Sequence, residues 1–489
     1  MRTTITLLFF LVSFIAISQS ITARLIDKSS QKPIPYANIK TGENAGTISN
    51  DEGFFTVPFE DETKTITISC MGYENKILTV KEIKKLDFVI ELKETLNQLD
   101  EVFISNTRPN ANAIIAKVKT KLAENYSYDL NAYNIFHRFT DHMDFEKLEC
   151  EIDKASHVKK KQLEAANRDL KNLAEQVKHS NMVQFSDVKG KVFTLNKDSI
   201  KLKVEKATLL LDHKKNFSID NIQEKTQNII LKYLDTTKTY KLKSGLFKIE
   251  DSLALNDEEF KDKKINEHKV ALLNNKVKSI LGLSQFHSES FLSKILNTSL
   301  YEYALEDMGY NNGELTYIIS FIPKKGKAKY TGKIYVCDDT YAITRLDFNY
   351  YKNRHGQKVN LKLILGIKYI ENMSEGTLIF ERDSTNMYHP KYIKHTAGSY
   401  FYVSRPLKFI ENSDDRYKVG FEFKIEGSNN SKEELLITGH RELTFLDFQA
   451  ERQAEKAPIQ VLNAYEKTIW DDEGILAPSL EMKAFEESK

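Results

Sequence analysis

The stretch Thr47–Phe55, "TISNDEGFF", places three side chains with amide or carboxylate oxygens, Asn50, Asp51 and Glu52, directly before a glycine. Such oxygens suit Ca²⁺, but a helix-flanked calcium loop needs them at alternate positions, followed by a distal Glu. That spacing is missing, and the flanking residues are β-branched or aromatic. The stretch therefore predicts a tight turn, with Gly53 at positive φ and Asn50 or Asp51 hydrogen-bonding to its own backbone.

The eleven histidines do not form a zinc-peptidase pattern. Catalytic zinc needs three protein ligands and an open water position, yet no histidine is followed by Glu three residues later, and HExxH is absent. In His287-Ser288-Glu289 and His440-Arg441-Glu442 the acid lies two residues away, on the same side of a strand. Two groups alone do not make a catalytic zinc site, so each is interpreted as a solvated pair. No metal site is predicted.

Other reactive motifs are also missing from the sequence. The segment "GLSQF", residues 282–286, lacks the second Gly of a serine-hydrolase elbow, and no Gly-rich phosphate loop is present. Acidic pairs such as Asp338-Asp339 and Asp414-Asp415 fall at expected turns. A glycosidase needs no local motif, so the sequence neither favours nor excludes one. We predict no catalytic residues and no cofactor, and a protein that is not an enzyme.

Residues 20–92 consist of short segments in which apolar and polar residues alternate. Ile21, Ala23 and Leu25 alternate with polar residues, and so do Ile66, Ile68 and Cys70. Segments rich in Gly, Pro, Asn and Asp separate them, as chain reversals require. The pattern predicts a small β-sandwich.

Residues 20–105 resemble a known family. Pro33 and Pro35 precede "YANI", Gly46-Thr47 and "DEGF" follow, and Gly72-Tyr73 comes later. In these marks the segment is similar to the carboxypeptidase-regulatory-like domain of exported Bacteroidetes proteins. The resemblance implies a seven-stranded transthyretin-like or immunoglobulin-like sandwich that serves as an accessory module and carries no catalytic residues.

The N-terminal residues and the overall composition predict where in the cell the protein is located. Residues 1–18 combine Arg2, an apolar block and small residues before a cleavage point, which is typical of a secretory signal peptide. No later segment is predicted to cross a membrane after signal cleavage. The net charge of +2 argues against nucleic acid as a partner. Only three cysteines are present, so a disulfide framework is not implied. We predict export to the periplasm or to the periplasmic face of the outer membrane.

Residues 111–300 predict a mixed helical connector. "ANAIIAKVKTKLAENY" is amphipathic, and "HSESFLSKIL" suggests a further helix. A second amphipathic segment carries apolar residues at alternating intervals of three and four, namely Leu163, Ala166, Leu170, Leu173 and Val177. That segment is either a surface helix packed on its own domain or a helix that binds a partner.

Residues 300–447 predict one large curved antiparallel sheet in meander order, apolar on one side. Alternation runs through residues 346–350, 359–369 and 419–425. "YTGKIYVCDDTYAITRLDFNY" resembles a unit of periplasmic lipoprotein carriers, whose concave apolar sheet is closed by helices. The resemblance implies an apolar ligand; the alternative is that the chain's own helices fill that side. The candidate apolar binding face comprises Leu346, Phe348, Tyr350, Leu361, Leu363, Leu365, Phe421 and Phe423.

Together these observations predict a multidomain α+β protein with an N-terminal immunoglobulin- or transthyretin-like β-sandwich, a helical connector, and a large curved antiparallel β-sheet with packed helices. Residues 450–489 are expected to form a C-terminal tail that docks on the sheet domain. The predicted function is that of a non-enzymatic cell-envelope binding or assembly protein, with an envelope protein or a lipid or other apolar ligand as partner. The alternatives are an envelope protein associated with a peptidase or glycan hydrolase, and a purely structural spacer.

Overall fold

The computed structural model describes residues 19–42, 46–59, 61–95, 109–178, 180, 182–211, 225, 228, 231, 234–255, 267–311, 313–470 and 475–485. The predicted signal peptide, residues 1–18, and residues 96–105 at the end of the predicted sandwich domain lie outside the described residues. The chain divides into two compact units. One comprises residues 1–96 and 466–479, and the other comprises residues 97–465 and 480–489.

The first unit contains a small β-sandwich of seven strands in two sheets, ordered β4-β1-β7 and β3-β2-β5-β6. Apolar residues of both sheets, among them Leu25, Ile39 and Phe55, form one buried core. This arrangement confirms the predicted sandwich. Its elements are β1 (Gln19–Asp27), β2 (Asn38–Lys40), β3 (Gly46–Ile48), β4 (Phe54–Phe59), β5 (Thr65–Ser69), β6 (Lys76–Thr79), α2 (Val80–Lys85) and β7 (Val89–Leu92).

The acidic stretch before β4 is a turn, as predicted. Asn50 Oδ1 accepts hydrogen bonds from the backbone N–H groups of Glu52 at 3.0 Å and Phe54 at 2.9 Å. Gly53 has φ +79°, and a Cβ there would lie 2.4 Å from the carbonyl oxygen of Leu25. Only glycine fits this position without strain, so the acidic residues serve chain reversal.

A C-terminal segment of the chain belongs to the same unit. Residues 466–479 cluster with the sandwich and include the 3-10 helix η2 (Lys467–Trp470). Thr47 Oγ1 donates a buried hydrogen bond of 3.0 Å to the carbonyl of Ile475. This part of the tail therefore packs on the sandwich. The described residues on either side of it, 450–465 and 480–485, belong to the sheet unit, so the predicted docking on the sheet domain holds for only part of the tail.

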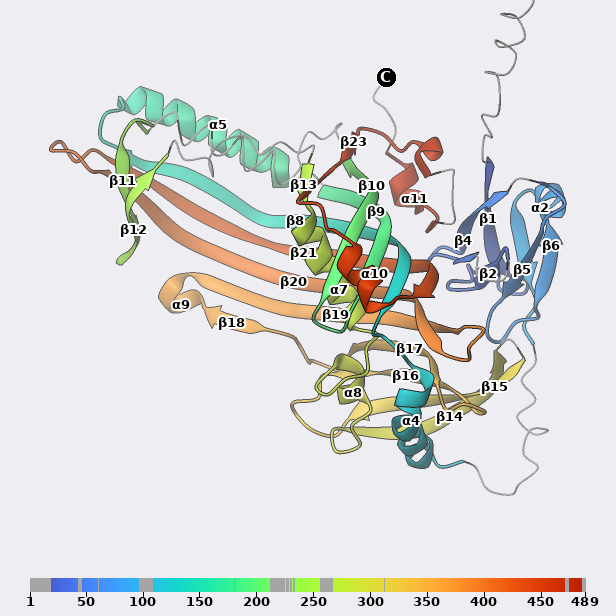
Figure 1. Ribbon diagram of the computed structural model, residues 1–489. Coiled ribbons are helices and arrows are strands. Elements are labelled where there is room, and N and C mark those ends of the chain that lie inside the picture. The colour runs from blue at the N-terminus through green and yellow to red at the C-terminus, as the bar shows by residue number, and fades with distance from the viewer. Residues whose placement is uncertain are drawn as a thin grey trace, which may run out of the picture. The chain divides into compact units, whose positions relative to one another are not determined.

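The second unit is built on a sheet of 14 strands. Its main path is ordered β14-β15-β16-β17-β19-β20-β21-β8-β9-β10-β23 (Figure 1). Every pair on this path is antiparallel except β10 with β23. The strands are β8 (Asn131–Ala155), β9 (Met182–Thr194), β10 (Ile200–Leu211), β11 (Thr239–Ser244), β12 (Phe247–Ala254), β14 (Tyr301–Asn311), β15 (Glu314–Pro323), β16 (Tyr330–Cys337), β17 (Ile343–Tyr350), β18 (Lys358–Leu361), β19 (Ile367–Arg382), β20 (Tyr388–Glu411), β21 (Lys418–Glu442) and β23 (Gln460–Leu462).

The run from β14 to β21 confirms a meander, but the sheet extends beyond residues 300–447. The long strand β21 pairs on its other side with β8, from Val419 opposite Ala155 to Glu442 opposite Asn131. Residues 131–211 therefore supply strands β8, β9 and β10 to the same sheet rather than a helical connector. Two further short strands, β13 (Glu267–Lys269) and β22 (Lys456–Pro458), pair with each other.

Helices of this unit pack on the sheet. Buried residues of α4, α7 and α8 share one core with strands from β8 to β21, while Ala166 and Leu170 of α5 pack on a second cluster. The amphipathic segment near residue 166 is thus a surface helix packed on its own domain. The helices are α4 (Ala111–Asn125), α5 (Lys160–Lys178), α7 (Val270–Gly282), α8 (Phe291–Ile295), α9 (Lys362–Leu365), α10 (Phe445–Ala450) and α11 (Leu480–Lys483).

Among the described residues, no helix has the length and apolar character that a membrane crossing requires. The three cysteines, Cys70, Cys150 and Cys337, form no disulfide. Cys70 follows β5 and is only half-buried, and Cys337 is buried.

Candidate functional site

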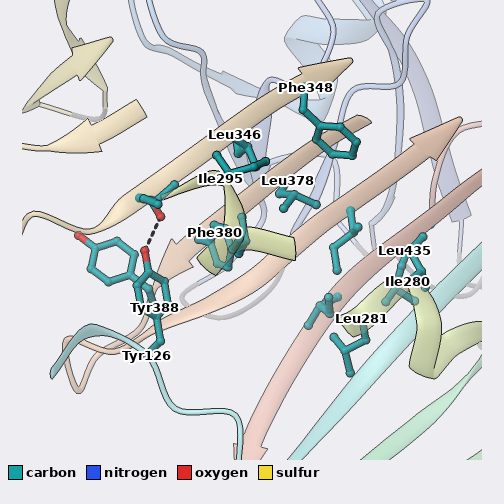
Figure 2. Close-up of a cluster of buried hydrophobic side chains, with 14 of the residues drawn as sticks. Tyr126, Ile280, Leu281, Ile295, Leu346, Phe348, Leu378, Phe380, Tyr388 and Leu435 are labelled. Carbon is teal, nitrogen blue, oxygen red and sulfur yellow. Dashed lines mark hydrogen bonds between the residues drawn. The ribbon is translucent and has the colours of Figure 1, made fainter. Parts of the chain in front are cut away.

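Two residues of the candidate apolar face, Leu346 and Phe348, lie in the main core. Both belong to β17 and are buried. The ring of Phe348 lies 4.6 Å from that of Phe291 on α8, and Figure 2 shows both β17 residues among side chains such as Ile295 of the same helix. The chain's own helices therefore close this part of the sheet, as the alternative interpretation expected.

Three further residues of that face are also covered in part or in full. Phe421 is fully buried beside residues of α5, and Phe423 stacks on it with ring centroids 6.1 Å apart. Tyr350 is half-buried and stacks on Tyr330 at 5.1 Å. Phe421 and Leu346 lie in separate clusters, so the predicted residues do not form one continuous site.

The remaining three residues, Leu361, Leu363 and Leu365, do not continue a strand. Strand β18 ends at Leu361, the four-residue helix α9 follows, and β19 begins at Ile367. Gly366 adopts φ +64°, and a Cβ there would lie 2.1 Å from the carbonyl oxygen of Ser404. The alternation correctly predicted strand in residues 358–361 and from residue 367 onward. It was wrong over α9, because the chain reverses at Gly366 and forms two strands rather than one.

The reversal leaves large apolar side chains exposed. Leu363 is fully exposed at 101% and its neighbour Ile364 is 80% exposed. A second pair of strands, β11 and β12, is joined through a two-residue loop, Gly245-Leu246, with Gly245 at φ +58°. A positive φ at the first loop residue is the pattern of a type II′ hairpin. Leu246 is 100% exposed at its end, and Phe247 and Ile249 are more than half exposed.

One side chain of β20, Arg405, holds the two exposed segments together. Its Nε donates to Ser244 Oγ at 2.7 Å and its Nη2 to the Ser244 carbonyl at 3.1 Å. Its Nη1 donates to the carbonyl of Leu365 at 2.9 Å, and the guanidinium lies over the ring of Phe247 at 5.5 Å. Figure 1 places α9 and the β11–β12 hairpin at the same end of the long strands. We call Leu246, Phe247, Ile249, Leu363 and Ile364 the apolar tip.

A row of lysines lies beside the apolar tip. Lys243 of β11 is directly paired with Lys248 of β12 and with Lys408 of β20. Directly opposite side chains point to the same side of a sheet, and like charges in such positions are destabilising. Asp251 accepts a 2.6 Å ion pair from Lys248, and this hydrogen bond raises the pKa of Lys248. The same carboxylate lies 3.8 Å from Lys241, so one acid faces several ammonium groups.

Within the described part of the chain, one grouping of His and Asp side chains could hold a metal ion. It consists of Asp383, His389 and His440, whose ligand atoms lie within 4.8 Å of one another. The sequence predicted a solvated pair of His440 with Glu442, yet His440 Nε2 lies 3.3 Å from Asp383 Oδ2. No local motif marks this grouping, because His440 lies 57 positions after Asp383. Only the pairing of strands β20 and β21 brings them together.

The protonation states of this grouping follow from burial and hydrogen bonding. Burial acts to raise the pKa of Asp383, but hydrogen bonds from Thr385, Met387 and His440 outweigh it and lower that pKa to about 2. Burial, followed by the neighbouring His440, lowers the pKa of His389 to about 4, although Asp383 opposes this shift. At neutral pH the grouping therefore holds an ionised carboxylate beside a neutral His389.

Two family models match the chain. Residues 21–104 match the CarboxypepD_reg-like domain, which confirms the resemblance of the sandwich to that family. Residues 212–404 match a model described as a family of unknown function, DUF5686. The second match spans both segments of the apolar tip. No curated protein matches the chain.

Proposed function

We propose that this protein is an exported cell-envelope binding protein that docks on the surface of an anionic lipid bilayer through its apolar tip. The observation that carries the proposal is the apolar tip itself, in which two separate loops present Leu246, Phe247, Leu363 and Ile364 to solvent. Arg405 holds both loops in a fixed relation. Side chains held in this way are arranged for contact with an apolar phase.

The size of the apolar contribution supports a lipid contact. Full burial of a Leu, Ile or Phe side chain is worth about 1.5–3 kcal/mol, and the apolar tip offers five such side chains. Each Lys near an anionic membrane surface adds about 1 kcal/mol. Lys243, Lys248 and Lys408 lie beside the apolar tip, so apolar insertion and charge attraction act together.

The same features favour a bilayer over a protein partner. Lysine is depleted at protein–protein interfaces, whereas Lys beside exposed Leu and Phe is typical of segments that lie in a membrane interface. Asp251 pairs with Lys248, but the like-charge pairs of Lys243 with Lys248 and Lys408 remain and cost stability. An anionic headgroup layer would neutralise this row while the loops enter the acyl boundary.

The extracytoplasmic location in this proposal is supported by two features of the N-terminal part. Residues 1–18 have the composition of a secretory signal peptide. The CarboxypepD_reg-like sandwich, residues 21–104, follows directly. We propose the periplasm or the periplasmic face of the outer membrane as the location, with the sandwich as an accessory interaction module.

Vesicle flotation tests the proposal. The mature chain is mixed with vesicles of phosphatidylglycerol and phosphatidylcholine, or of phosphatidylcholine alone, and the floating fraction is measured. We expect binding to the anionic vesicles that weakens as salt is raised. The double variant Leu363→Asp/Ile364→Asp should bind at least about 100-fold more weakly, because it loses two apolar contacts and places two charges at the lipid.

The matched control is Leu272→Asp on α7. Leu272 is 60% exposed in the same unit but is not part of the apolar tip. This variant should float like the wild type. Failure of the wild-type chain to float with anionic vesicles, or equal binding by the double variant, would overturn the proposal.

A further inference from the structure

The turn that follows β19 holds the carboxylate of Asp383 in one orientation. Asp383 Oδ1 accepts hydrogen bonds from the backbone N–H of Thr385 at 2.8 Å, from Thr385 Oγ1 at 2.8 Å and from the N–H of Met387 at 2.9 Å. These three donors saturate that oxygen. Oδ2 is therefore the atom that faces the histidines.

Two imidazole rings converge on that same oxygen. His389 Nε2 lies 3.1 Å and His440 Nε2 lies 3.3 Å from Asp383 Oδ2. The rings are stacked with centroids 3.9 Å apart, and the ring of Tyr133 packs against both, at 6.2 Å and 6.5 Å. Packing thus fixes both Nε2 atoms toward one point beside the carboxylate.

Two of the three spacings match a metal coordination sphere. With bonds of about 2.0–2.1 Å, two ligands of a tetrahedral zinc ion lie about 3.3–3.4 Å apart. The two nitrogen–oxygen separations are 3.1 and 3.3 Å, and all three ligand atoms lie within 4.8 Å of one another. Two imidazole nitrogens and one carboxylate select a first-row transition metal over Ca²⁺ or Mg²⁺, which prefer oxygen ligands.

The geometry points to a site for a divalent transition-metal ion of the zinc class, bound by Asp383 Oδ2, His389 Nε2 and His440 Nε2. Exposure falls in the order expected for a site with an entry path, because the side chain of His440 is 25% exposed while those of Asp383 and His389 are 12% and 6% exposed. Three protein ligands leave at least one coordination position for water or another ligand. This inference does not depend on the proposed lipid contact.

Isothermal titration with Zn²⁺ alone tests the site, using the full mature chain stripped of metal by a chelator. We expect one ion per chain and a rise in the unfolding temperature on zinc addition. His440→Ala and Asp383→Asn should weaken zinc binding by more than the roughly 10–100-fold that loss of an outer-shell partner costs. Asn is chosen at position 383 because it keeps an acceptor for the turn.

The control variant is His287→Ala, since His287 is a half-buried histidine of the same unit that is not part of the grouping, and its Nδ1 lies 2.8 Å from the Ser288 carbonyl oxygen. It should bind zinc like the wild type. The absorption spectrum of the wild-type chain with Co²⁺ reports nitrogen and oxygen ligation without any variant. Absence of a stoichiometric zinc or cobalt complex, or unchanged affinity in folded His440→Ala, would overturn the assignment.

Discussion

Similar apolar side chains are buried in one region of the large sheet and exposed in another. Around β17, Leu346 is buried in a core closed by helices α7 and α8. At the apolar tip, Leu363 of α9 and Leu246 of the β11–β12 hairpin are fully exposed. The first region is covered by the packed helices α7 and α8. The second consists of a two-residue hairpin loop and the four-residue helix α9, whose apolar side chains extend into solvent. We infer that the first region provides stability and the second provides contact.

Truncating a leucine should affect stability strongly in the buried region and hardly at all in the apolar tip. Leu346→Ala should lower the free energy of unfolding by about 2–5 kcal/mol, because it opens a cavity among side chains that pack on all sides. Leu363→Ala should change it by no more than about 0.5 kcal/mol. Chemical denaturation of both variants, monitored by circular dichroism, measures the difference.

Equal losses in the two variants would contradict the comparison. They would mean that Leu363 is covered in solution, either by another part of the chain or by a second copy. Light scattering at two protein concentrations, applied to the same samples, distinguishes these two causes.

A charge reversal in the lysine row should have smaller effects: it should raise stability and weaken binding to anionic vesicles. Lys243→Glu replaces the central member of the Lys248–Lys243–Lys408 row and turns two like-charge pairs into attractive ones. Stability should rise by roughly 0.2–1 kcal/mol, while binding to anionic vesicles should fall about 10-fold or more.

Lys171→Glu on α5 serves as the matched control for that reversal, because Lys171 is an exposed lysine that is not part of the row. It carries the same change in net charge and should alter neither quantity by a comparable amount. Equal weakening of vesicle binding by both variants would show that net charge, rather than the row, governs attraction.

Features set by neighbouring residues could be predicted from the sequence. The turn at Asn50 and Gly53 needs only local hydrogen bonds and one positive φ, and the alternation at Leu346 and Phe348 marks a true strand. The segment "LKLIL", residues 361–365, failed because its alternation fits a strand equally well. The decisive residue is Gly366, which must approach Ser404 on the neighbouring strand.

Features set by distant pairing could not be predicted in this way. The β21–β8 ladder joins Phe421 to Ile152, so β8, β9 and β10 enter the sheet although the sequence around them also contains helices. The grouping of Asp383 with His440 depends on the fold in the same manner, since the two are 57 positions apart. Exposure of the apolar tip depends on which segments pack together in three dimensions, which a sequence pattern does not encode.

Tryptophan fluorescence tests directly whether the apolar tip enters an anionic bilayer, because Trp470 is the only tryptophan in the chain. In a Trp470→Phe background, Phe247→Trp places a single reporter in the apolar tip, and Leu272→Trp places one on α7 as a control. If the apolar tip enters the bilayer, anionic vesicles shift the emission of the Phe247→Trp reporter to the blue and brominated lipids quench it. The emission of the Leu272→Trp reporter stays unchanged with both kinds of lipid. Unchanged emission from the Phe247→Trp reporter with anionic vesicles would contradict the proposed lipid contact.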